Sequence, residues 1–318
     1  MRNFHVMWSK YGTFGILILL VLVLGLLSPE YFLTANNLTQ VMLQSAITIL
    51  VGCGEFFTIL IAGIDLSVGS MMALTGMVTA KLMLAGMPIA LAILLGGVIV
   101  GALLGAINGF LVNKTGLHPF IVTLGTLSVY RGITLIISDA RPVFGLPQEF
   151  KEGIAGWIWK IPIPVIIAIG IALLLTFVTD KTKMGRNIYA LGGNSQAAWF
   201  SGINIQLHTL MVFVISGICS GIAGVVMTAR LGAAEPLAGN GFETIAIASA
   251  IIGGTSFFGG KGKIFGVVMG GLIIGVISNG LNILNVPTYY QQIVMGSLII
   301  LAVFVDKLFS LKKFSMKG

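Results

Sequence analysis

The run IALAILLGGVIVGALLGAINGFLV, residues 89–112, contains no charged side chain. A helix needs about 20 apolar residues to cross the hydrocarbon core of a bilayer, so this run predicts a membrane-spanning helix. Similar runs recur along the chain. The sequence therefore predicts an all-α polytopic membrane protein with about ten transmembrane helices, near residues 12–28, 41–62, 66–87, 89–112, 118–137, 162–179, 207–229, 243–258, 264–284 and 288–306. The run at 243–258 is short and contains IIGGTS, which indicates a broken or re-entrant segment.

The composition agrees with a single transmembrane domain over residues 1–318. Hydrophobic residues make up 57% of the chain and charged residues 9%, whereas a soluble domain carries roughly 25% charged residues. The net charge of +8 does not indicate a nucleic-acid partner, because the basic residues form no stripe. An excess of Lys and Arg on the cytoplasmic side of a membrane explains the same total.

The distribution of Lys and Arg predicts the orientation. An even number of spans puts both termini on one side, and the first run, which lacks a cleavage site, is read as an uncleaved span. With the N-terminus inside, the inner segments hold 12 of the 18 basic residues and the outer loops hold four. The inner residues are Arg2, Lys10, Lys114, Lys181, Lys183, Arg186, Lys261, Lys263, Lys307, Lys312, Lys313 and Lys317, and the outer ones are Arg141, Lys151, Lys160 and Arg230. We therefore expect both termini to lie in the cytoplasm.

Glycines recur at every fourth position from Gly97 to Gly109. Such a row lets a second helix approach closely, and packing is favoured over the alternative of a pore lining. GALLGAINGFL at 101–111 matches GLIIGVISNGL at 271–281 with one residue inserted, in spans predicted to run in opposite directions. This pattern suggests two inverted five-helix halves, an arrangement found in transporters.

Polar residues inside the spans are candidates for a translocation path, because a polar side chain in a bilayer is costly. The alternative for each uncharged one is a helix–helix hydrogen bond. Glu55 and Arg131 fall at different depths, so no direct salt bridge between them is expected. The candidate path residues are Glu55, Asp65, Ser67, Asn108, Thr123, Thr126, Arg131, Asn279, Asn282 and Gln291.

Signatures of catalysis and of metal or nucleotide binding are not found. The chain has no G-x-x-x-x-G-K-[ST] and no H-E-x-x-H, which argues against a nucleotide site and a zinc protease. Cys53 and Cys219 lie in apolar runs and are read as small buried hydrophobes. We expect no enzymatic activity, cofactor or metal on this chain.

Six ordered motifs resemble the permease subunits of bacterial ABC importers for monosaccharides, the family of the ribose, xylose, arabinose, galactose, allose and autoinducer-2 permeases. The motifs are GIDLSVGS at 63–70, GALLGAINGFLV at 101–112, PFIVTLGTLSVYRGI at 119–133, GRNIYALGGNSQAAWFSGI at 185–203, AIIGGTSFFGGKGKIFG at 250–266 and NGLNILNVPTYYQQIVMGSLIILAV at 279–303. The resemblance implies a homodimer of permeases in a bacterial inner membrane that passes a monosaccharide or similar small polyol. It also implies a separate cytoplasmic ATPase, which binds ATP and Mg, and a periplasmic sugar-binding protein.

The resemblance also implies a role for the inner loop, about 180–206. In this family such a loop carries a short helix that docks on the ATPase, and Asn194 is placed to cap it. The coupling residues implied are Gly185, Arg186, Gly193, Asn194, Ala197, Ala198, Ser201 and Gly202, the small ones permitting close docking. The outer loop, about 138–161, suits an amphipathic segment at the membrane surface.

Two other classes of protein remain as alternatives. An ion-coupled secondary transporter with inverted repeats would need several buried carboxylates at mid-membrane, and a scaffold or receptor would not need the glycine-rich spans. For Asp65, the favoured reading is that Asp65 and Ser67 supply acceptors to the amides where the next helix begins. A lumen or gating role is the alternative.

Overall fold

The computed structural model describes residues 2–315, with side chains described for residues 12–304, 306 and 307. Arg2, Lys10, Lys312 and Lys313 therefore lie outside the described side chains, and Lys317 lies outside the described residues. Nearly every described segment is helical. In chain order the elements are α1 (Arg2–Leu27), α2 (Ala35–Leu60), α3 (Val68–Leu84), α4 (Ile89–Ala92), the π-helix η1 (Ile93–Ile99), α5 (Val100–Thr115), α6 (Pro119–Ser138), α7 (Gln148–Ala155), β1 (Trp157–Ile158), β2 (Ile161–Pro162), α8 (Ile163–Lys181), α9 (Lys183–Gly193), α10 (Ser195–Phe200), α11 (Ile205–Leu231), α12 (Phe242–Ile252), α13 (Ile264–Ile283) and α14 (Thr288–Ser315).

Each predicted span corresponds to one apolar helix. Among the described residues, six helical segments are long and apolar enough to cross a membrane, and four further apolar helices are shorter. The short ones are Gly12–Leu27, Val68–Leu84, Phe242–Ile252 and Thr288–Phe304. The predicted break near residues 243–258 is present, because α12 ends at Ile252 and an irregular loop leads to α13.

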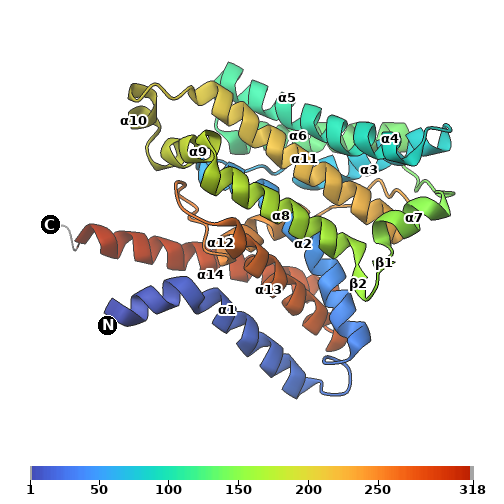
Figure 1. The fold of residues 1–318 in the computed structure, drawn as a ribbon, viewed down its shortest axis with the longest axis horizontal. Coiled ribbons are helices and arrows are strands. Elements are labelled where there is room, and N and C mark those ends of the chain that lie inside the picture. The colour runs from blue at the N-terminus through green and yellow to red at the C-terminus, as the bar shows by residue number, and fades with distance from the viewer. Residues whose placement is uncertain (1, 316–318) are drawn as a thin grey trace.

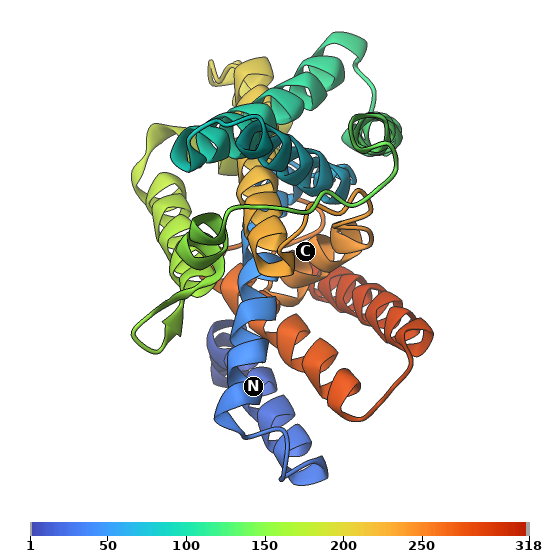
Figure 2. The same ribbon diagram turned by 90° about the vertical axis from the view of Figure 1, so that its right-hand side faces the viewer.

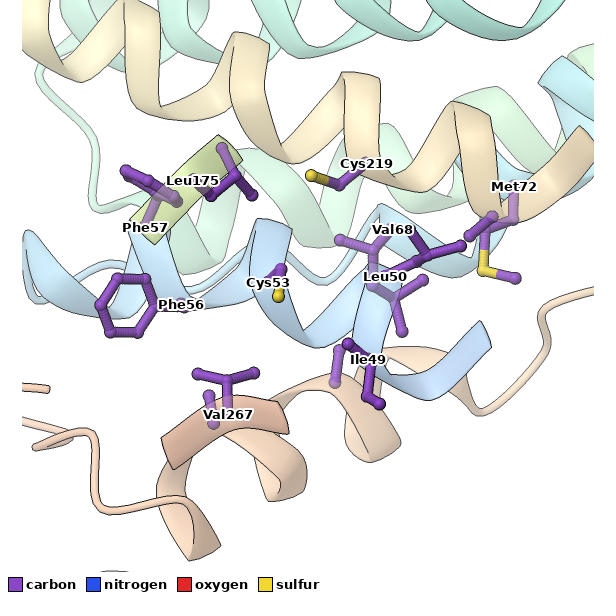
Figure 3. Packing of buried hydrophobic residues seen from close by; sticks show 14 of the residues in the cluster. Ile49, Leu50, Cys53, Phe56, Phe57, Val68, Met72, Leu175, Cys219 and Val267 are labelled. Carbon is purple, nitrogen blue, oxygen red and sulfur yellow. The ribbon is translucent and has the colours of Figure 1, made fainter. Parts of the chain in front are cut away.

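Helix α2 lies at the centre of the molecule, and every residue from Ser45 to Leu60 is buried. Viewed along the long axis, α2 and α11 are central, with α8 on one side and α12 and α14 on the other (Figure 2). Cys53 and Phe56 of α2 lie between Cys219 of α11 and Val267 of α13 (Figure 3). In a bilayer this core is held by van der Waals packing rather than by the hydrophobic effect, because lipid is as apolar as the side chains.

The glycine rows let helix backbones touch. A methyl group at Gly101 would lie 2.5 Å from the Gly217 carbonyl oxygen of α11, and one at Gly105 would overlap the Phe213 carbonyl. In α13, a methyl group at Gly271 would lie 2.6 Å from the side chain of Ile49 in α2. The packing reading of these glycines is therefore confirmed, because the small residue is needed for close approach.

The helix contacts follow the pattern of two inverted halves. Helix α11 packs on α5 as α2 packs on α13, and α3 packs on both α6 and α11 as α12 packs on both α14 and α2. Helix α5 runs toward the end of the molecule that carries α9 and α10, whereas α13 runs away from it (Figure 1). The first turn of α3 and the irregular segment before α12 meet at Gly69 and Gly239, where a methyl group on either residue would overlap the carbonyl of the other. The predicted inverted relation thus includes α2, α3, α5 and α6 on one side and α11, α12, α13 and α14 on the other.

One stretch of the fourth span departs from an ordinary α-helix. Residues Ile93–Ile99 form a π-helix between α4 and α5. A methyl group at Gly96 would lie 2.7 Å from the Cα of Thr79 in α3, and one at Gly97 would lie 2.6 Å from Val225 in α11. The wide turn therefore coincides with two adjacent glycines that pack on two different neighbouring helices.

The two long loops are ordered and lie at opposite ends of the molecule. The 138–161 segment contains α7 and the start of a two-stranded antiparallel hairpin, in which Trp157 pairs with Pro162. The 180–206 segment contains α9 and α10. In Figure 1 the ends of α1 and α14 nearest the chain termini lie at the same end of the molecule as α9 and α10.

Candidate functional site: a buried polar junction and an exposed aromatic helix

The α2–α3 junction is the irregular segment that carries GIDLSVGS. Helix α2 ends at Leu60, and Ala62 adopts a left-handed φ of 58°. The Gly63 amide then donates to the Thr58 carbonyl at 2.9 Å, which closes the end of the helix. The chain turns at this point while still inside the bundle, and its polar groups must find partners there.

Asp65 supplies most of those partners. Its Oδ1 accepts from the Ser67 amide at 3.0 Å and from the Ser67 hydroxyl at 2.6 Å, while Oδ2 accepts from the Ser216 hydroxyl of α11 at 2.9 Å. The expectation that Asp65 serves an amide where α3 begins is confirmed. The expectation that Ser67 also supplies a cap acceptor is wrong, because the Ser67 side chain makes no cap hydrogen bond and donates to Asp65 instead.

The junction is connected to the first glycine-rich span through Asn108. Its amide nitrogen donates to the Ser67 hydroxyl at 2.8 Å and lies 3.5 Å from Asp65 Oδ1. The Tyr130 hydroxyl of α6 is 3.0 Å from Asn108 Oδ1 and 2.9 Å from the Leu104 carbonyl. Helices α5, α6 and α11 therefore meet the α2–α3 junction in one hydrogen-bonded network.

Glu55 is the second carboxyl group of this network. Its Oε1 accepts from the Asp65 amide at 3.1 Å, and its Oε2 has no hydrogen-bond partner among the described residues. Arg131 lies elsewhere, and its guanidinium donates to the Pro236 and Ala238 carbonyls at 2.7 and 2.9 Å. The expectation that Glu55 and Arg131 form no direct salt bridge is therefore confirmed.

Helix α6 binds both irregular segments. The Thr123 hydroxyl accepts from the Leu66 amide at 3.1 Å and lies 3.0 Å from the Ile64 carbonyl, so it holds the α2–α3 junction. Arg131, two turns later, holds the segment before α12. Thr126 lies between them and donates to the Thr123 carbonyl at 3.4 Å.

The remaining candidate path residues do not join the cluster. Asn279 of α13 forms a reciprocal amide pair with Asn37 of α2, at 2.7 and 3.0 Å. Gln291 donates to Asn282 at 2.8 Å near the α13–α14 turn. The structure thus brings together five of the ten predicted residues, Glu55, Asp65, Ser67, Asn108 and Thr123, all of them fully buried. Their burial means that these five line no open passage in this conformation.

The inner loop folds into two short helices with well-defined starts. The Thr182 hydroxyl accepts from the Gly185 amide at 3.1 Å at the start of α9. The Asn194 side chain accepts from the Ala197 amide at 2.9 Å at the start of α10, so the predicted cap is confirmed. Gly185 has no room for a side chain against the Val178 and Thr179 carbonyls, whereas Arg186 is exposed.

The exposed surface of α10 is aromatic. Trp199 is 63% and Phe200 80% exposed, and their rings meet edge to face with centroids 5.0 Å apart. Ala198 is only 3% exposed and faces the protein, so the expectation that it contributes to a docking surface is wrong. Ala197 and Ser201 are exposed, and the Ser201 hydroxyl donates to the Ala197 carbonyl at 2.9 Å. Gly193 is also exposed, and Gly202 ends the turn with a φ of 78°.

Sequence reasoning missed four residues of these two regions. Ser216 and Tyr130 complete the buried network, yet nothing in the sequence around either residue indicates its partner. Trp199 and Phe200 stand in the quoted GRNIYALGGNSQAAWFSGI motif. An aromatic pair beside an N-cap in a polar loop was the signal that could have found them.

Residues 37–303 match the family model described as "Branched-chain amino acid transport system / permease component". The match spans most of the chain and includes both the junction and α10. The chain belongs to this permease family. It is therefore a multi-pass inner-membrane transport component and not an enzyme, and the match does not favour an ion-coupled secondary transporter.

Relatives match over nearly their whole length. The chain is 65% identical over 308 residues to the D-allose transport system permease protein AlsC of Escherichia coli strain K12, covering 97% of this chain and 94% of the relative. It is 41% identical to the ribose import permease protein RbsC of Bacillus subtilis strain 168, covering 96% and 95%. It is 39% identical to the ribose import permease protein of Haemophilus influenzae, covering 95% and 94%. No solved structure matches.

Proposed function

We propose that this permease carries a monosaccharide through the membrane as part of an ABC importer, and that D-allose is the first sugar to test. The family description names branched-chain amino acids, whereas the relatives reported above are named for sugars. The relatives that match the whole chain are named for sugars, and the one named for D-allose is 65% identical. Whole-length identity at that level is the observation that carries the choice of a sugar.

The proposal includes partner chains that supply energy and substrate. A cytoplasmic ATPase binds ATP and Mg, a periplasmic binding protein delivers the sugar, and a second copy of this chain completes the path. The exposed pair Trp199 and Phe200 supports an ATPase contact, because large aromatic side chains dominate the binding energy of protein interfaces. The coupling surface we propose is centred on these two residues, with Arg186, Ala197 and Ser201 beside them.

We assign α9, α10 and both chain termini to the cytoplasm. Helices α9 and α10 and the terminal ends of α1 and α14 lie at one end of the molecule, and the β1–β2 hairpin lies at the other (Figure 1). The excess of Lys and Arg in the segments on the α9–α10 side favours a cytoplasmic location for that end.

The path itself is proposed to open at the α2–α3 junction. The five buried polar residues become accessible only when the junction moves, whereas Arg131, Asn282 and Gln291 are at least partly exposed already. Hydroxyl and amide groups suit a neutral, hydroxyl-rich solute, because they exchange hydrogen bonds with it without holding a charge. Alternating access then follows from rocking of the two bundles as the ATPase closes and reopens.

The test is uptake of radiolabelled sugar into vesicles that contain the permease, with the ATPase and the binding protein added. We expect ATP-dependent uptake of D-allose or a related monosaccharide. The double variant Trp199→Ala/Phe200→Ala should lower uptake and stimulated ATP hydrolysis about tenfold or more, since interface aromatics often contribute 2 kcal/mol or more. Its melting temperature should not change, because both side chains are exposed.

The matched control is Trp157→Ala, which removes a half-exposed tryptophan from the hairpin at the opposite end. It should leave ATP hydrolysis and uptake at the parent level. Sugar uptake driven by an ion gradient without ATP would refute the proposal and support the secondary transporter.

A further inference from the structure

The inner end of α2 is held by backbone groups from two other segments. Leu60 is the last residue of α2 and is fully buried. Its carbonyl accepts from the Gly260 amide at 2.8 Å, a bond from the loop between α12 and α13. A carbonyl in the last turn of a helix has no partner within the helix. The loop therefore supplies a partner that the helix lacks.

Helix α9 reaches the same carbonyl through Gly192. A methyl group on Gly192 would overlap the Leu60 oxygen and lie 2.7 Å from the Gly260 amide nitrogen. Gly259 and Gly260 have left-handed φ values of 83° and 68°, which residues with a side chain rarely adopt. The backbones of α2, α9 and the α12–α13 loop thus meet with no space for a Cβ. No side chain lies between them that could absorb a relative movement.

A second contact ties α9 to this loop. The Tyr189 hydroxyl of α9 donates to the Gly262 carbonyl at 2.8 Å. Burial, with a smaller contribution from the Asp180 carboxylate, raises the pKa of Tyr189 to about 12, so the hydroxyl keeps its proton at any physiological pH. The loop is anchored in turn to α14, because Asp306 Oδ2 accepts from the Ser256 hydroxyl and the Phe257 amide, both at 3.1 Å.

These contacts lie between α10 and the buried polar junction. Helix α10 follows α9 directly, with Asn194 as the shared cap residue. On the other side, Leu60 lies midway in sequence between Glu55 and Asp65. The Asp65 amide donates to the Glu55 carboxyl group. Any displacement of α9 therefore acts on the one stretch of α2 that leads into the junction.

We propose that Tyr189, Gly192 and Gly260 form an inner latch that passes movement of α10 to the end of α2 and so opens the α2–α3 junction. The proposal rests on the proposed function, since it assumes that an ATPase moves α10. Tyr189 and Gly192 are positioning residues that touch neither sugar nor ATPase. They set the position of Leu60, and the latch differs from the docking surface because it lies behind α10 rather than on it.

The experiment uses the permease reconstituted with its ATPase and binding protein, and it measures sugar molecules imported per ATP hydrolysed. Gly192→Ala displaces α9 from Leu60 without altering Trp199 or Phe200. We expect co-purification with the ATPase and ATP hydrolysis at the parent rate, with import per ATP lowered about tenfold. The matched control is Gly170→Ala in α8, where a methyl group meets no atom within 4 Å. Its import per ATP should equal that of the parent.

Tyr189→Phe provides a milder variant, because it removes one hydroxyl and keeps the ring. Import per ATP should fall about threefold, while Tyr31→Phe, at an exposed tyrosine far from α9, should change nothing. This variant decides the matter if Gly192→Ala gives little folded protein. Parent-level import per ATP in Tyr189→Phe would overturn the latch and leave the proposed function standing. Absence of ATP-driven sugar import in the parent would instead refute the proposed function.

Discussion

Asp65 is the acceptor for donor groups on three neighbouring residues. The Ser67 amide and hydroxyl, the Ser216 hydroxyl and the Asn108 amide group all point at its carboxyl oxygens. A buried donor left without a partner costs about 1–3 kcal/mol. In the closed network around the α2–α3 junction, water cannot replace a lost acceptor.

We expect Asp65→Leu to destabilise the permease by several kcal/mol, because it orphans these donors at once. The isosteric change Asp65→Asn keeps one acceptor oxygen for Ser67, and its amide can donate to the Ser216 hydroxyl. The melting temperature in detergent and the yield of monodisperse protein should fall sharply for Asp65→Leu and little for Asp65→Asn. Equal melting temperatures for Asp65→Leu and the parent would contradict the role assigned to Asp65.

At the scale of residues, sequence reasoning identified polar atoms but not their partners. Asp65 and Asn108 stood out because each interrupts an apolar run. Ser216 lies 151 residues from Asp65 in the chain, and nothing local marks it as a partner. The inward face of α10 was also misassigned, because a six-residue helix has too few positions to show which side is buried.

At the scale of elements, the glycine rows decide which helices can touch. Gly105 of α5 packs against the Phe213 carbonyl of α11, and Gly101 packs against Gly217 in the same way. Backbone on both sides of a contact leaves little room for relaxation. Overpacking of this kind costs about 1–3 kcal/mol or more.

Gly105→Val should therefore separate α5 from α11 and lower the melting temperature of the permease. In the most severe case, no folded protein would be obtained. Gly170→Val places the same side chain in α8, where a Cβ meets no atom within 4 Å. Thermal unfolding of the two variants, followed by size-exclusion chromatography, measures the difference. A melting temperature for Gly105→Val equal to that of Gly170→Val would show that the close approach is dispensable.

The spans could be predicted because hydropathy and length are local properties. Each of the ten runs is found as an apolar helix. The π-helical stretch Ile93–Ile99 could not be predicted, because an apolar run has the same hydropathy whether it forms an α-helix or a π-helix. It lies where Gly96 and Gly97 pack on two neighbours, which is a property of the packed bundle.

At the scale of the whole molecule, the two ends carry different elements. One end carries α9, α10 and the inner latch, and the other carries α7 and the β1–β2 hairpin (Figure 1). Cys53 and Cys219 are buried, so introduced cysteines can report which end faces which compartment with little background.

We expect Lys160→Cys in the hairpin to react with a membrane-impermeant maleimide in right-side-out spheroplasts. Gln196→Cys in α10 should react only after the membrane is opened. Both positions are exposed in the structure. The reverse pattern of labelling would invert the assigned orientation, and labelling of both in sealed spheroplasts would contradict their placement at opposite ends.

The inverted arrangement could be suggested from one short repeat, but the helix pairs that define it could not. The match of residues 101–111 with 271–281 marks α5 and α13 as counterparts. That α5 packs on α11, and α13 on α2, depends on contacts between helices separated by a long stretch of sequence, since α5 ends at Thr115 and α11 begins at Ile205. Such contacts leave no periodic signal in a single chain.

The contact between Gly69 and Gly239 has a consequence for attempts to engineer this transporter. Because Gly69, at the start of α3, meets Gly239, in the segment before α12, through bare backbone, neither position can accept a side chain that would adjust the fit. The side chains that can be exchanged lie on α6, where Thr123 is hydrogen-bonded to the α2–α3 junction and Arg131 to the segment before α12. Substitutions at Thr123 and at Arg131, two turns apart on the same helix, would therefore change the anchoring of each segment independently of the other.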